Sequence, residues 1–190
     1  MQKLLAQTYL PKGTSDNDSA AWFIAGSDFF TAAAYTQWIA KDADLQLANR
    51  NTKIFLFEQT YGSRVMQSNT SDVVTQKLKG YRPVTHSSDI PFVWMQDKLW
   101  EAEVQFNRTI PFDYTLANAY GYWWTNFAKY GRPTLDNSWR PVPSRSRMQH
   151  FRIDKPELGG MRMVDGYKAL DTLIFQDVLT GLYGDSPQPY

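Results

Sequence analysis

The sequence predicts an α/β fold from two kinds of apolar pattern. Across residues 20–46 and again across 114–130, apolar side chains recur every three to four positions, as in amphipathic helices. Between these segments the run Ile54–Phe57 is continuous and apolar, with polar residues on both sides. Such a run is typical of a strand that is buried on both faces of a parallel sheet. Helices that pack on a sheet are therefore expected.

The first fifty residues are expected to be helical. Residues 1–10 predict a short helix that stops at Pro11. After a polar loop, Asp18 or Ser19 can cap the next helical segment, because a short polar side chain accepts a hydrogen bond from the first turn. The pattern over residues 20–46 predicts one or two amphipathic helices, with a break near Gly26.

A polar stretch from Tyr61 to Arg82 has no clear periodicity and predicts a long loop. A loop of this length inside a compact domain is usually functional or mobile. It leads to a polar turn that contains His86, one of only two histidines in the chain. Histidine can take and return a proton near neutral pH, so His86 is a candidate general base. A surface or hydrogen-bonded role is the alternative for a histidine on a loop.

The elements that follow are predicted from spacing and caps. Residues 98–106 predict a short helix, and Asp113 is a plausible cap for a longer helix from about Tyr114 to Tyr130. This long helix carries one apolar stripe that is expected to pack in the core, and Gly131 and Pro133 end it. Its stripe consists of Leu116, Tyr120, Trp123, Trp124 and Phe127.

The C-terminal third predicts a surface crossing, strands and a helix. Residues 134–147 contain Pro141 and Pro143 and are expected to cross the surface. Alternation around residues 151–153 and 161–163 predicts a strand or a pair of short strands. Asp165 is a candidate cap for the last helix. The apolar stripe of this helix is Tyr167, Leu170, Ile174, Val178 and Leu182.

Composition excludes several classes of function. With 190 residues, 43% apolar and 21% charged, the chain is expected to form one globular domain with a substantial core. The net charge is +1 and there is no long basic run, so nothing indicates a nucleic-acid partner. No apolar run approaches the roughly 18 residues of a transmembrane helix. The first residues lack the pattern of a signal peptide. The chain has no cysteine, and therefore no disulfide or thiol chemistry.

Three motifs occur in an order that resembles one enzyme family. The segment Arg82–Trp94 resembles the histidine loop of type-B carboxylesterases, the family that includes the cholinesterases, with Pro83 in place of that family's glycine. The segment Tyr122–Pro133 resembles the family's Tyr-Trp-Thr-Asn-Phe-Ala-Lys-x-Gly-x-Pro helix end, and Ser27–Phe30 is a weaker match. The resemblance covers nearly the whole chain. Cholinesterase-like relatives often carry a disulfide here, but both expected positions, near Thr31–Ala33 and near Leu173, lack cysteine.

The resemblance implies the C-terminal part of an α/β-hydrolase fold, which is the last strands of the sheet with their packing helices and is incomplete on its own. Residues 1–190 would then be the C-terminal portion of a type-B carboxylesterase domain. His86 would be the catalytic histidine of a Ser-Glu-His triad, whose nucleophile and acid precede it in sequence. The chain contains no Gly-x-Ser-x-Gly, so this portion is expected to be inactive alone. Glu58 and Asp89 can in principle orient His86, but neither matches the family's acid.

Further expectations follow from the same resemblance. The implied substrate of the full-length protein is a carboxylic ester, either a small molecule or lipid-like, and neither a metal nor an organic cofactor is needed. A cholinesterase-like binding or adhesion module without catalysis is the alternative function. His150 matches no motif of the family and is expected to be structural. Phe92 and Trp94 either line a substrate pocket or serve in packing.

Three glycosylation sequons begin at Asn17, Asn69 and Asn107. Together with the resemblance, they predict a glycoprotein that is secreted or travels the secretory pathway.

Overall fold

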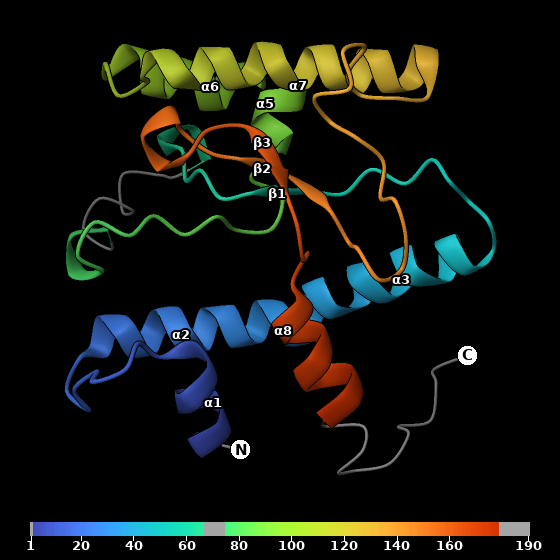
Figure 1. Cartoon of the computed structure of the whole chain (residues 1–190). Helices are drawn as coiled ribbons and strands as arrows, with labels where there is room; N and C mark the ends of the chain where they lie inside the picture. The colour runs from blue at the N-terminus through green and yellow to red at the C-terminus, as the bar shows by residue number, and fades with distance from the viewer. Residues whose placement is uncertain (1, 67–74, 179–190) are drawn as a thin grey trace. The chain divides into compact units, whose positions relative to one another are not determined.

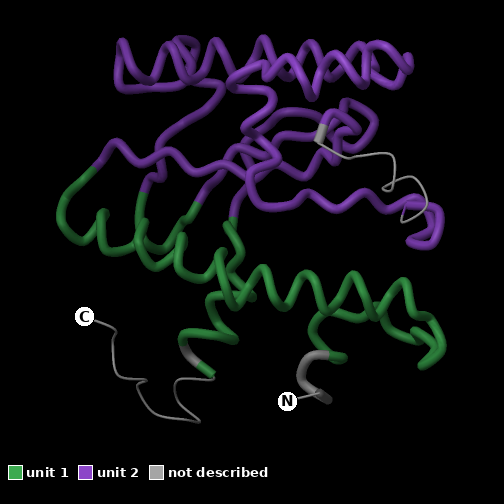
Figure 2. Tube along the Cα trace, turned by 180° about the vertical axis from the view of Figure 1, so that it is seen from behind, with its two compact units in different colours: residues 1–51, 144–148, 166–190 green, residues 52–143, 149–165 purple. Residues whose placement is uncertain are grey.

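The computed structural model describes residues 2–66 and 75–178 (Figure 1). The chain divides into two compact units, drawn in separate colours in Figure 2. Unit 1 comprises residues 1–51, 144–148 and 166–190, and unit 2 comprises residues 52–143 and 149–165. Each unit is therefore built from segments that lie far apart in the sequence.

Unit 1 begins with three helices. Helix α1 spans Gln2–Tyr9, α2 spans Ser19–Thr31 and α3 spans Gln37–Ala48. Asp18 caps α2 as predicted, since its Oδ1 accepts a hydrogen bond from the N–H of Ala21 at 3.2 Å. The predicted break near Gly26 is wrong, because α2 runs through that residue. The irregular turn lies later, in the π-helical segment η1 (Ala32–Thr36), which joins α2 to α3.

The C-terminal segment of unit 1 is helical but differs from the prediction. Helix α8 spans Ala169–Thr172 and continues into the π-helical segment η4 (Leu173–Val178). Asp165 does not cap this helix. Its carboxylate accepts a hydrogen bond from Gln149 Nε2 at 2.7 Å, while Lys168 occupies the N-cap position with a φ of 45°. The last member of the predicted stripe, Leu182, lies outside the described residues.

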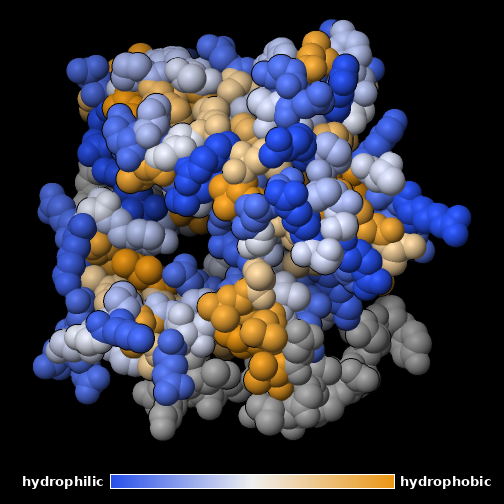
Figure 3. All heavy atoms as spheres, viewed as in Figure 1, coloured by the Kyte–Doolittle hydropathy of each residue, from blue (hydrophilic) through white to orange (hydrophobic). Residues whose placement is uncertain are grey.

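A buried carboxylate joins the segments of unit 1. Asp171 in α8 accepts a hydrogen bond from the hydroxyl of Tyr9 at 3.0 Å and another from Thr36 at 2.9 Å. Burial and the Asp171 carboxylate raise the pKa of the Tyr9 phenol, which therefore stays neutral and can donate. Leu170 in α8 and Leu173 at the start of η4 are exposed, and Figure 3 shows hydrophobic side chains gathered over this part of unit 1.

Unit 2 is built on a three-stranded sheet in the order β1-β2-β3. Strand β1 spans Phe57–Gln59, β2 spans His150–Ile153 and β3 spans Arg162–Val164. β1 and β2 are parallel, whereas β2 and β3 form the predicted pair of short strands and are antiparallel. The predicted strand Ile54–Phe57 is displaced toward its C-terminal side. The carbonyl of Ile54 accepts from the N–H of Val142, so that residue lies outside the ladder with β2.

One face of this sheet is apolar and packs on helix α7, which spans Pro111–Tyr130. Phe57 on β1 meets Tyr120 and Trp124 of α7 edge to face, with ring centroids 6.4 and 5.5 Å apart. Trp139 stacks on Phe151 at 4.9 Å. Residues 134–147 were expected to lie on the surface, but Trp139 is 3% exposed and belongs to the core. Its large ring fills the space between the sheet and α7.

Helix α7 begins three residues earlier than predicted, and Asp113 acts from inside its first turn. Oδ2 of Asp113 accepts the N–H of Ile110 at 2.8 Å, while Oδ1 accepts the hydroxyls of Tyr61 and Ser63 at 2.7 and 2.6 Å. Gly131 ends the helix with a φ of 65°, as predicted. In the predicted stripe, Leu116, Tyr120 and Trp123 are buried, whereas Trp124 and Phe127 stay partly exposed.

Candidate active site

His86 lies exposed on a tight turn in unit 2. The turn runs from Thr85 to Ser88, and the N–H of Ser88 donates to the carbonyl of Thr85 at 3.1 Å. Ser87 has a φ of 67°, which is the conformation that the third residue of a type II turn requires. A residue other than glycine rarely adopts this conformation, and such outliers cluster at functional sites. His86 therefore occupies the second position of a turn with a fixed shape.

The turn leads directly into helix α5, which spans Ile90–Trp94. The carbonyl of Asp89 accepts the N–H groups of Phe92 and Val93 at 3.0 and 3.1 Å. Phe92 is 1% exposed and stacks on Tyr120 of α7, with 6.1 Å between ring centroids. This contact fastens the turn that carries His86 to the core of unit 2. Phe92 therefore serves in packing, whereas Trp94 is 73% exposed.

Helix α6, spanning Asp97–Gln105 as predicted to within one residue, also supports α5. Trp100 of α6 is buried, and its Nε1 donates to the carbonyl of Pro91 at 2.9 Å. Its ring meets Phe92 edge to face at 5.9 Å. Pro91 lies at the start of α5, shortly after His86 in the sequence. This bond therefore helps to hold the histidine turn in place, in addition to the contact of Phe92 with Tyr120.

The chain that enters the turn is held beside the end of β1. A Cβ atom on Gly62 would lie 2.6 Å from the carbonyl oxygen of Arg82 and 2.7 Å from its Cβ. Only glycine allows the two backbones to come this close. The stretch from Tyr61 to Arg82 contains the short 3₁₀ helix η2 (Arg64–Met66). The Asn69 sequon, which falls within it, lies outside the described residues.

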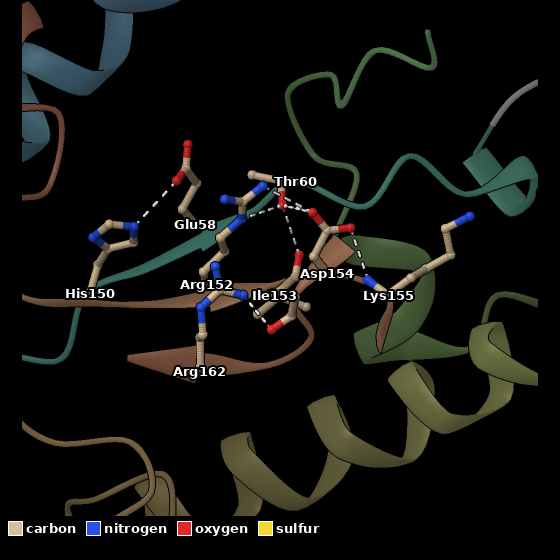
Figure 4. A network of polar contacts seen from close by, with 9 residues as sticks. Glu58, Thr60, His150, Arg152, Ile153, Asp154, Lys155 and Arg162 are labelled. Carbon is tan, nitrogen blue, oxygen red and sulfur yellow. Dashed lines mark hydrogen bonds and ion pairs between the residues drawn. The ribbon is translucent and has the colours of Figure 1, made fainter. Parts of the chain in front are cut away.

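The polar face of the sheet, opposite α7, holds the other histidine. His150 on β2 is buried, and its Nε2 lies 3.3 Å from Oε2 of Glu58 on β1, as Figure 4 shows. Glu58 therefore pairs with His150. Within the same face, Asp154 accepts the hydroxyl of Thr60 at 2.6 Å and a guanidinium N–H of Arg152 at 3.1 Å. These contacts join β1 to β2, which fits the structural role expected for His150.

The charge of Asp89, the second acidic residue near His86, also acts on the buried phenol of Tyr120. Burial is the main cause that raises the pKa of the Tyr120 phenol, and the charge of Asp89 adds to it. Tyr120 is completely buried and donates its hydroxyl to Oε1 of Gln59 at 2.6 Å. The neutral phenol thus links the core of α7 to β1 beneath the histidine turn.

An apolar cavity of about 410 Å³ opens between the start of β1, the C-terminal half of α7 and the segment that follows α7. Its walls are aromatic and aliphatic, and Phe57, Trp124 and Phe127 are three of the lining residues. Trp94 does not line it. Among residues 2–66 and 75–178 there is no group of three or more His, Cys, Asp or Glu side chains that could hold a metal ion.

The sequence names His86 as a candidate, but the residues that shape its turn were not predicted. The hydroxyl of Ser88, a buried residue, accepts the N–H of Thr85 at 2.9 Å. Gly62 gave no signal, because its constraint comes from a residue twenty positions away.

The comparisons with known proteins fit this architecture. The model of the carboxylesterase family matches residues 1–172. The chain, which combines helices with a small mixed sheet, therefore belongs to the carboxylesterase family, as its motifs predicted. None of the curated proteins compared with the chain matches it. Within the described part of the chain, no helix is both long enough and apolar enough to cross a membrane.

Proposed function

We propose that this chain is the C-terminal portion of a serine carboxylesterase and supplies His86 as the general base. The observation that carries the proposal is an exposed histidine on a turn of fixed shape, in a chain of the carboxylesterase family. In such an enzyme a serine attacks the carbonyl carbon of the ester. His86 takes the serine proton and then passes it to the leaving alcohol.

In this proposal the serine nucleophile, the acid and the oxyanion hole are supplied by sequence outside this chain. The chain has no Gly-x-Ser-x-Gly, its Glu58 pairs with His150, and neither Glu58 nor Asp89 matches the acid of the family's motif. The carboxylate that orients the imidazole and the backbone groups that stabilise the oxyanion are therefore expected from upstream sequence. The substrate class is a carboxylic ester, either a small molecule or lipid-like. Residues 1–190 alone are expected to be inactive.

A secretory route belongs to the same proposal. The sequons at Asn17 and Asn107 lie on exposed residues, where an oligosaccharide can be attached without displacing the core. Asn107 follows helix α6 and has a φ of 51°, which places it in a turn at the surface. Mass spectrometry of the natural protein, with and without glycosidase treatment, would test both positions. Unmodified peptides at both positions would contradict this part of the proposal.

The catalytic role is tested in the complete gene product, assayed on a simple ester such as p-nitrophenyl acetate. His86→Ala is expected to lower kcat by about 10⁶-fold, as for loss of the base in other triads. The control is His150→Gln, which changes the only other histidine and should retain activity if the protein folds. An active His86→Ala enzyme would refute the proposal. A natural product without any serine elbow would instead favour a cholinesterase-like binding or adhesion module.

A further inference from the structure

The hydroxyl of Ser88 closes the turn around His86. Its Oγ accepts the N–H of Thr85 at 2.9 Å and lies 3.2 Å from the hydroxyl oxygen of Thr85. The backbone N–H of Ser88 donates to the carbonyl of Thr85 at 3.1 Å. The residue before His86 is thus joined to the second residue after it by three contacts. Ser88 is 8% exposed whereas Thr85 is exposed, so these bonds are partly shielded from water.

We propose that Ser88 is a positioning residue for His86. This inference rests on the proposed function, in which His86 is the base. Without the Ser88 hydroxyl, the turn in which Ser87 adopts a φ of 67° would keep two backbone hydrogen bonds, from Ser88 to the carbonyl of Thr85 and from Ile90 to the carbonyl of Ser87, both at 3.1 Å, but would lose both side-chain contacts to Thr85. That conformation is unfavourable for a residue with a side chain. The side-chain contacts to Thr85 offset this cost and keep the imidazole in one orientation.

The position of Ser88 in the fold makes this closure effective. Ser88 directly precedes Asp89, whose carbonyl accepts the N–H groups of Phe92 and Val93 in α5. Helix α5 is fixed by Phe92 on Tyr120 and by Trp100 on the carbonyl of Pro91. A change at Ser88 therefore leaves α5 in place and loosens only the three residues before it. This separates a positioning role from a general role in folding.

The first test uses the unmodified chain and requires no enzyme assay. In a hydrogen-exchange experiment on the 190-residue chain, the Thr85 amide should exchange slowly, because its acceptor is a buried hydroxyl. The amide order parameter of His86 should be that of rigid backbone, about 0.85. A Thr85 amide that exchanges at the unprotected rate, or a His86 order parameter below about 0.6, would overturn the proposal.

The second test compares four variants by the same NMR measurements. Ser88→Ala should lower the order parameter of His86 and broaden its imidazole signals, whereas those of His150 stay unchanged and serve as an internal reference. Ser88→Thr should restore order, because it returns the hydroxyl. Ser87→Gly should keep it, because glycine adopts a positive φ without strain. Ser146→Ala, which removes a hydroxyl contact to Ser144 at the surface, is the matched control. An unchanged His86 in folded Ser88→Ala would refute the proposal.

The activity of the complete gene product separates this inference from the proposed function. If the protein hydrolyses esters, Ser88→Ala should lower kcat by about 100-fold with little change in KM, since the base is present but misplaced. Unchanged kcat would overturn the proposal. If the protein hydrolyses no ester while Ser88→Ala still loosens His86, the proposed function fails and the role of Ser88 in holding the turn stands.

Discussion

Gly62 shows how one residue far from the chemistry can set the approach to a site. The backbone of Arg82 lies so close that a Cβ at position 62 would overlap its carbonyl oxygen. We expect Gly62→Ala to lower the free energy of unfolding by about 1–3 kcal/mol, because the two segments must separate. Urea denaturation would measure this change. Gly26→Ala is the control, since its Cβ would enter open space within α2, and it should be neutral or stabilising. Equal effects of the two variants would contradict the prediction.

Tyr61 gives the chain a predictable response to alkaline pH. Burial and the hydrogen bond to Asp113 raise the pKa of the Tyr61 phenol above its ordinary value near 10. The folded protein thus holds this proton more tightly than the unfolded chain. The stabilisation is complete below about pH 10 and is lost as the pH rises through the folded pKa.

We therefore expect the free energy of unfolding to fall above about pH 10, and to fall less steeply in Tyr61→Phe. The slope should not vanish, because burial also raises the pKa of Tyr9 and Tyr120. Denaturation curves at several pH values would give the slope for each variant. Tyr130→Phe, at an exposed position, is the control. A Tyr61→Phe slope equal to that of the unmodified chain would show that this phenol makes no contribution.

At the scale of elements, the start of helix α7 depends on Asp113. This carboxylate is 1% exposed and accepts three hydrogen bonds, from Tyr61, Ser63 and Ile110. We expect Asp113→Ala to cost about 3 kcal/mol, because two buried hydroxyls lose their acceptor. Asp97→Ala, in the exposed first turn of α6, should cost less than about 1 kcal/mol. Urea denaturation would compare them, and similar costs would show that burial at Asp113 is unimportant.

The sequence predictions were accurate where neighbouring residues determine the structure and inaccurate where residues far away in the sequence do. Helices α6 and α7 were predicted because their apolar spacing is local. The strand around Phe57 was displaced, since its register depends on Phe151, more than ninety residues away. The role of Asp165 was wrong because a distant partner, Gln149, takes its carboxylate. Trp139 was assigned to the surface from neighbouring prolines, but its contacts come from β1, β2 and α7.

The candidate site likewise has features that follow from local sequence and features that depend on distant contacts. His86 became a candidate through a motif of consecutive residues, whereas the contact between Ser88 and Thr85 in its turn was not predicted. The neighbours of Glu58 and Asp89 could not be predicted from the sequence. Glu58 meets His150 because β1 pairs with β2, and Asp89 lies near Tyr120 because α5 packs on α7. A sequence motif can thus name a candidate residue, whereas the residues that lie beside it depend on the folded arrangement.

At the scale of the whole molecule, unit 2 exposes an aromatic surface at the C-terminal half of α7. Trp124, Phe127 and Tyr130 are 36%, 49% and 57% exposed, and the first two line the 410 Å³ cavity beside β1. Exposed apolar surface of this kind promotes association. We expect the 190-residue chain to bind the dye ANS and to form larger species as its concentration increases, which sedimentation velocity would detect.

Phe127→Lys should reduce both the dye binding and the association, because a charge on this surface must be desolvated when another molecule covers it. Phe106→Lys is the matched control, since Phe106 is 58% exposed at the end of α6 and does not line the cavity. In the proposal that further carboxylesterase sequence precedes this chain, the same surface has a covering partner within one protein. The longer product should then bind less dye per molecule. A monomeric 190-residue chain at every concentration would show that this surface is not adhesive.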